Sequence, residues 1–189
     1  IDDGTQLVIG QWSANKVLRY SRSSATATTW TLRETITGGS ASGDRFGWVL
    51  HISKDGKTLA INQLKDGGST TGKLNIYTRA DNGATTNFGS TADANFTGAS
   101  GDMLGSANVG TEVSNDGSYI LSEANNNDTG GSDRGQVYVF ELSGSTWTKR
   151  VINSPSDVAD DDRNGSSTAM SKGDSLRVCY AGKEDGDVF

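Results

Sequence analysis

The chain has 189 residues and a mass of 19.8 kDa, which is enough for one sizeable domain with its own core. Its net charge of −6 argues against a nucleic-acid partner, because phosphate binding needs a basic surface. No apolar run approaches the roughly 20 residues of a membrane-spanning helix, so we expect no membrane insertion. Twenty-five glycines against one proline favour turns and short strands over helices. We therefore predict an all-β protein.

A repeat of about 60 residues organises the chain. Three segments share one register, and their final glycines stand 58 and 60 residues apart, at Gly47, Gly105 and Gly165. An apolar stretch and then a tight turn follow each segment. In the first two copies the turn contains Asp-Gly, at residues 55–56 and 116–117. Asp-Gly between apolar runs is a strong hairpin signal, since a type I′ turn needs positive φ.

Strands are expected at matching places in each copy. After each turn comes an apolar strand, at residues 6–9, 58–61, 119–121 and 176–179. A strongly β run follows, at residues 16–20, 73–77, 136–140 and 187–189. A last strand is expected around Trp30 and Trp147, and near Phe88 in the middle copy. Four short strands per unit predict a β-propeller of four-stranded antiparallel blades. A β-sandwich, the competing architecture, does not repeat its turns on a fixed period.

The repeat divides one propeller domain into four parts. Residues 1–38 supply strands two to four of a partial blade, and residues 159–189 supply strands one to three of another. Complete blades are expected at residues 39–98 and 99–158. Because propellers carry four to eight blades, we predict a partial propeller that belongs to a longer chain. Assembly of several copies into one ring is the alternative.

The repeats resemble FG-GAP repeats, the blades of integrin-α-like propellers and of many large surface proteins. The resemblance rests on residues 44–48 (Asp-Arg-Phe-Gly-Trp), 53–61 (Ser-Lys-Asp-Gly-Lys-Thr-Leu-Ala-Ile), 135–140 (Gly-Gln-Val-Tyr-Val-Phe) and 145–148 (Ser-Thr-Trp-Thr). The chain departs from the family where the Gly-Ala-Pro corner is replaced, as by Gly-Gln-Trp at residues 10–12, and where Leu104 and Asn164 stand in place of the phenylalanine. The resemblance implies a propeller fold and an extracellular or cell-surface role in adhesion or assembly.

One segment is a candidate calcium site. Alternating oxygen ligands followed by glycine match the first half of an EF-hand-type loop, at Asp160, Asp162 and Asn164. Ser171 stands where such a loop needs a glutamate. The repeat also accounts for the segment without a metal, because Asp44 and Asp102 occupy the place of Asp162. Calcium is the only cofactor that the sequence suggests.

Some aromatic and asparagine residues are candidate contact or modification sites. Trp12 stands in the loop where the family has its corner, and we expect it to contact a partner or a glycan. We expect Trp30 and Trp147, at equivalent positions, to pack between blades. In an exported eukaryotic protein, three sequons would accept glycans, at Asn95, Asn127 and Asn164.

Nucleophilic catalysis has little support in the sequence. His51 is the only histidine and lies in a predicted strand, and Cys179 lies in a β run where a small buried residue is expected. We therefore predict a non-enzymatic extracellular or surface module for adhesion or structural assembly. Its partners would be proteins or further blades. The alternatives are a carbohydrate-binding propeller and a propeller glycoside hydrolase that uses two of the many carboxylates.

Overall fold

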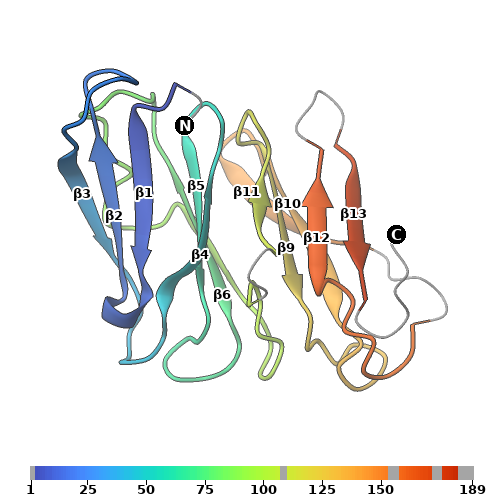
Figure 1. The fold of residues 1–189 in the computed structure, drawn as a ribbon. Coiled ribbons are helices and arrows are strands. Elements are labelled where there is room, and N and C mark those ends of the chain that lie inside the picture. Colours follow the sequence, from blue (N-terminus) through green and yellow to red (C-terminus); the bar gives the residue numbers. More distant parts are fainter. Residues whose placement is uncertain (1–2, 107–109, 153–157, 172–175, 183–189) are drawn as a thin grey trace.

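The computed structural model describes residues 3–106, 110–152, 158–171 and 176–182. These residues form β-strands and one short 3-10 helix, η1 (Trp12–Ala14), and contain no α-helix. The strands make four antiparallel sheets, which stand side by side in chain order (Figure 1). The prediction of an all-β fold built from repeated antiparallel sheets is confirmed. None of the described helices has the length and apolar character needed to cross a membrane.

Each sheet follows the strand order of the chain. The first sheet contains β1 (Gln6–Gln11), β2 (Lys16–Ser21) and β3 (Thr31–Thr37). The second contains β4 (Phe46–Ile52), β5 (Thr58–Gln63), β6 (Lys73–Thr78) and β7 (Ala94–Thr97). The third contains β8 (Glu112–Val113), β9 (Tyr119–Ala124), β10 (Gln136–Ser143) and β11 (Thr146–Ile152). The last contains β12 (Ser167–Met170) and β13 (Val178–Ala181); the run predicted at 187–189 lies outside the described residues.

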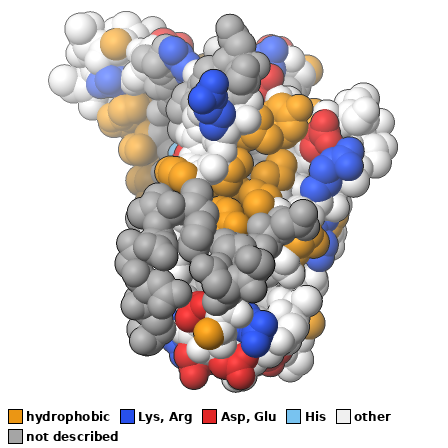
Figure 2. Space-filling model, turned by 90° about the vertical axis from the view of Figure 1, so that its right-hand side faces the viewer, with side chains coloured by type: hydrophobic (Ala, Val, Ile, Leu, Met, Phe, Trp, Pro, Cys, Tyr) orange, Lys and Arg blue, Asp and Glu red, His pale blue; other side chains and the backbone are white. Residues whose placement is uncertain are grey.

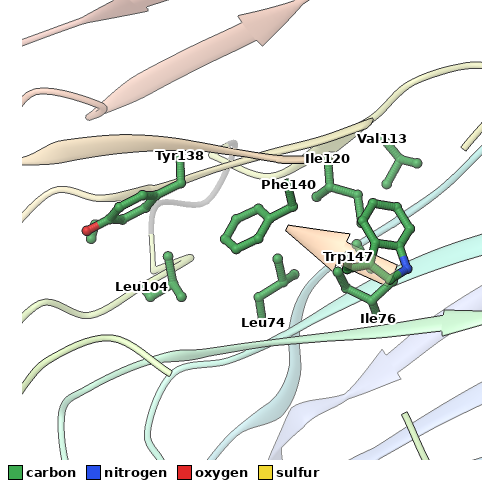
Figure 3. Packing of buried hydrophobic residues seen from close by; sticks show 10 residues of the cluster. Leu74, Ile76, Leu104, Val113, Ile120, Tyr138, Phe140 and Trp147 are labelled. Atoms are coloured by element: carbon green, nitrogen blue, oxygen red, sulfur yellow. The ribbon is translucent and has the colours of Figure 1, made fainter. Parts of the chain in front are cut away.

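The hydrophobic core lies between successive sheets. Between the second and third sheets, Phe140 of β10 points toward Leu74 of β6, and Trp147 of β11 lies near Ile76 (Figure 3). The rings of Phe140 and Phe96 are 4.7 Å apart between centroids. Two similar clusters join the other neighbouring sheets, and their buried members include Val17, Ile36, Leu59, Ile61 and Tyr77 in one and Leu121, Val137, Val139, Met170 and Tyr180 in the other. Trp147 packs between sheets as expected.

The glycine that ends each repeat segment lets one sheet approach the next. Gly105 has a φ of 72°, and a Cβ added to it would lie 1.5 Å from Nδ2 of Asn62 in the preceding sheet. Gly165 has a φ of 91°, and its Cβ would lie 2.8 Å from the Cβ of Glu123, which occupies the same register position as Asn62. Only glycine combines this backbone conformation with this close packing.

A buried polar network joins the first and second sheets. Arg19 is fully buried, and its Nε lies 3.2 Å from Oε2 of Glu34. Arg79, from the loop after β6, donates to Oε1 of Gln6 at 2.8 Å and stacks 4.7 Å above the Phe88 ring. Burial, reinforced by the charge of Arg19, lowers the pKa of Arg79 to about 10. Charged side chains thus replace part of the apolar core at this junction.

Of two further expectations, one is contradicted and the other stays open. The last strand of the second sheet is β7, not the segment near Phe88, because Phe88 enters the core from a loop and is only 6% exposed. Trp30 is half-buried just before β3, with the Arg22 guanidinium 4.7 Å over its ring. By register, Trp30 faces the side on which Trp147 meets the preceding sheet, and no sheet precedes β1–β3 among the described residues, so packing of Trp30 between blades stays a prediction.

Cys179 is exposed, contrary to the expectation of a buried residue. Its register position matches that of Ala60, which is fully buried because the third sheet covers it. Within the described residues, no sheet lies beyond β13. Figure 2 shows hydrophobic side chains gathered in the middle of this face. Position in the row of sheets, and not residue type, determines the exposure of Cys179.

Candidate interaction surface

An exposed tryptophan lies in a small aromatic and cationic cluster where the first and second sheets meet. Trp12 of η1 is 43% exposed, and its ring contacts the Trp48 ring edge-on, with 5.4 Å between centroids. The Arg45 guanidinium lies 5.2 Å from the centroids of both rings. We call Trp12, Arg45 and Trp48 the tryptophan–arginine cluster. Tryptophan and arginine are enriched among the residues that dominate protein interfaces.

Asn15 brings the parts of this cluster together. It has a left-handed backbone, with a φ of 53°, and ends the turn that carries Trp12. Its Nδ2 donates to the Ala41 carbonyl at 3.0 Å, and its Oδ1 accepts from the Phe46 N–H at 3.0 Å. One side chain therefore ties the β1–β2 turn to the segment that enters β4. Trp48 is fixed in turn, since its Nε1 donates to the Ser106 carbonyl at 3.2 Å.

The aspartate of each repeat segment caps the loop that precedes its sheet. Asp44 is fully buried and accepts backbone N–H groups from two loops, at Ser40, Ala41, Gly67 and Gly68. Asp102 accepts the N–H of Ala99 at 2.7 Å, and Asp162 accepts that of Ala159 at 2.5 Å. Burial would raise the pKa of Asp44, but the backbone N–H groups outweigh burial and lower it.

The Asp44→Asn variant should lose stability in a pH-dependent way. At pH 7 we expect a loss of about 1–3 kcal/mol, because the amide places a donor among N–H donors. The folded-state pKa of Asp44 lies below its unfolded value, so its contribution is complete above the unfolded pKa and is lost as pH falls through the folded one. Urea denaturation at several pH values checks this. A difference between wild type and variant that stays constant down to pH 2 would argue against it.

Two of the three proposed calcium ligands, Asp160 and Asp162, have hydrogen-bond partners for their carboxylates within the protein. The Oδ1 of Asp160 accepts from Nε of Arg134 at 2.9 Å, and Asp162 caps its own loop. Asn164 is 2% exposed, and its backbone forms an isolated parallel bridge with Gly135. Across the described part of the chain, no three His, Cys, Asp or Glu side chains form a group able to hold a metal. Calcium at Asp160, Asp162 and Asn164 stays a prediction.

The three sequons differ in exposure. Asn95 lies in β7 and is exposed, whereas Asn127 is 6% exposed and Asn164 is 2% exposed. Asn127 also accepts the Thr129 N–H at 3.0 Å, which stabilises its turn. Glycosylation at all three sites stays a prediction, and Asn95 has the acceptor that solvent reaches most readily.

A cavity between the second and third sheets contains carboxylates but also their hydrogen-bond partners. It measures about 390 Å³, and its lining includes Asp55, Asp93 and Asp116. Asp93 accepts from the N–H and hydroxyl of Thr78. Burial tends to raise the pKa of Asp116, but the hydroxyls of Ser114 and Ser118 and the Ser118 N–H lower it overall. A carboxyl with a lowered pKa is a poor general acid, so Asp116 is not suited to the acid role of a glycosidase pair.

Comparison with known proteins supports the fold alone. No protein-family model and no curated protein matches the chain. Among solved structures, the chain is similar to Sqt1 from Saccharomyces cerevisiae, a WD40 β-propeller, with a TM-score of 0.54 and 12% sequence identity. The match covers 93% of this chain and 38% of Sqt1, so the chain spans well under half of that protein. The described sheets are thus arranged as in a β-propeller, while the FG-GAP relationship stays a prediction.

Proposed function

We propose that this chain is a non-enzymatic protein-interaction module of propeller blades, and that the tryptophan–arginine cluster contacts the partner. The observation that carries the proposal is the exposed Trp12 ring, which contacts Trp48 and Arg45. Hydrogen bonds of Asn15 and Trp48 hold this arrangement in place. A rigid aromatic anchor loses little conformational entropy on binding. The row of sheets supplies the rigid support.

The finer features of the proposal come from the repeat pattern. We propose an extracellular or cell-surface setting and a role in adhesion or assembly, as the FG-GAP resemblance implies. The exposed sequon at Asn95 supports that setting. Carbohydrate binding is the second candidate, because an exposed indole ring such as that of Trp12 can stack on a sugar.

A photo-crosslinker at position 12 tests the proposal. Benzoylphenylalanine in place of Trp12, irradiated in extract of the source organism, should yield a discrete crosslinked protein. The same group at Val151, which is 53% exposed on β11, is the matched control and should not crosslink to that protein. With the partner in hand, Trp12→Ala should weaken binding by at least about 30-fold, as expected for an interface anchor worth 2 kcal/mol or more.

The outcomes separate the two candidate functions. Trp12→Ala should change the free energy of unfolding by no more than about 1.5 kcal/mol, the value of an aromatic pair, so a loss of binding would not reflect unfolding. Equal crosslinking from positions 12 and 151 would refute the protein-binding surface. Binding on a glycan array that Trp12→Ala abolishes would favour the carbohydrate-binding function instead.

A further inference from the structure

One edge of the first sheet has no strand beside it in the described part of the chain. β1 pairs with β2 alone, whereas β4, β8 and β12 lie on the corresponding edges of β5, β9 and β13. The register identifies β1 as a second strand, because Leu7 lies opposite Tyr20 just as Leu59 lies opposite Tyr77. The first sheet therefore lacks the first strand that the other three sheets have.

The backbone of β1 is oriented to accept such a strand. The Arg22 N–H donates to the Thr5 carbonyl at 2.9 Å, which places the odd-numbered residues of β1 in hydrogen bonds with β2. By the alternation of an antiparallel ladder, the N–H and C=O of Val8 point toward the open edge. In the second sheet, Ala60 occupies the place of Val8 and pairs with His51 of β4.

A groove runs along this open edge. It measures about 290 Å³ and lies between β1 and β4, lined by Gln6, Leu7, Val8, Leu50, His51 and Ile52. Most of these side chains are apolar, so the groove would bury one face of an incoming strand. The groove lies toward the start of β1, whereas the tryptophan–arginine cluster lies beyond its end. The two surfaces can therefore be tested separately.

Side-chain exposure shows that the outer face of β1 is uncovered as well. Leu7 is 42% exposed and Ile9 is 40% exposed. The residues at the same register positions in β5, Leu59 and Ile61, are fully buried, because they pack against the preceding sheet. The same apolar positions are thus buried in the second sheet and exposed in the first.

We propose that the edge of β1 binds an extended strand with the first-strand sequence pattern of this repeat, supplied from outside residues 1–189. The strand would lie antiparallel to β1 in the groove between β1 and β4. Main-chain hydrogen bonds to β1 would supply affinity, and alternate apolar side chains would enter the groove. This inference goes beyond the proposed function, since it assigns a second surface and the chemistry of its occupant.

A synthetic peptide tests this proposal on the intact chain. The probe copies residues 47–54 (Gly-Trp-Val-Leu-His-Ile-Ser-Lys), which include most of β4, and carries an amino-terminal fluorescein. We expect saturable binding by fluorescence anisotropy. Hydrogen exchange of the Val8 amide should slow in the complex by about tenfold or more, and that of Leu32 in β3 should not change.

Two methylated peptides are matched controls. Because the Ser53 N–H donates to the Thr58 carbonyl, alternation places the His51 N–H toward the neighbouring strand and that of Ile52 away from it. N-methylation at the histidine should therefore weaken binding by about tenfold, the effect of one lost hydrogen bond. N-methylation at the isoleucine should leave binding unchanged.

Several results would overturn the proposal. They are absence of saturable binding, equal affinity of the two methylated peptides, and protection of an edge other than β1. A dimer of this chain that buries β1 and resists the peptide would also overturn it, because the occupant would then be a second copy. Trp12→Ala should bind the peptide like the parent chain, so a failure here is distinct from a failure of the tryptophan–arginine cluster.

Discussion

Replacing Glu34 with alanine is expected to lower the free energy of unfolding by about 3–5 kcal/mol, the cost of leaving a buried charge without its partner. Arg19 is fully buried and would lose the carboxylate 3.2 Å from its Nε. The Glu34 carboxylate also accepts the N–H groups of Phe88 at 3.0 Å and Gly89 at 2.8 Å. The substitution therefore removes an ion pair and two anchors of the loop before β7.

Urea denaturation of wild type and variant measures this loss. Glu141→Ala is the matched control, because Glu141 forms an even shorter ion pair, 2.7 Å from Nε of Arg150, on the surface. The Arg150 side chain is 66% exposed, so solvent screens that pair and its loss should cost about 0–1 kcal/mol. Similar losses in the two variants would show that burial does not set the value of the Glu34 pair.

Gly72→Ala is expected to cost more than about 3 kcal/mol. Gly72 has a φ of 66°, a conformation that costs an L-residue about 1–2 kcal/mol. An added Cβ would also lie 2.2 Å from the backbone nitrogen of Leu104 in the next repeat. This contact belongs to a parallel bridge in which Leu104 N–H donates to the Thr71 carbonyl at 3.0 Å. Relief of the clash would require the two repeats to move apart.

Gly144→Ala separates these two contributions. Gly144 has nearly the same φ, 62°, but a Cβ there would meet no atom within 4 Å. This variant should lose only the conformational term of about 1–2 kcal/mol. Thermal unfolding of both variants gives the comparison, and equal losses of stability would mean that the bridge between repeats contributes nothing.

Gly135→Ala should behave like Gly72→Ala, because its Cβ would lie 2.3 Å from the Asn164 carbonyl oxygen.

The regular parts of the fold could be predicted from the sequence because local chemistry determines them. Alternating apolar runs and Asp-Gly turns located β5 and β9, and the repeat placed equivalent strands in one register. Buried charges could not be foreseen in this way. Arg19 occupies the register position of Ile76, which is apolar. Nothing in the sequence near Arg19 shows that it donates hydrogen bonds to Glu34 and Gln6.

The candidate site was predicted only in part for a similar reason. Trp12 stands where FG-GAP repeats, which the sequence resembles, have their Gly-Ala-Pro corner, and it is exposed. Its neighbours Arg45 and Trp48 lie more than thirty positions away and meet it through hydrogen bonds made by Asn15. Asn15 belongs to a turn, where asparagine is common, so its sequence context carried no signal of this role.

Because each sheet packs on its neighbours in the row, resistance to unfolding should not be uniform along the molecule. Removing the first or last sheet uncovers one packed face, whereas removing a middle sheet uncovers two. In a polypeptide of residues 1–189 alone, local unfolding should therefore begin at the first and last sheets and advance inward. If force is applied through residues 1 and 189, the sheets should unfold one after another. The second and third sheets, which enclose Phe140, should unfold last.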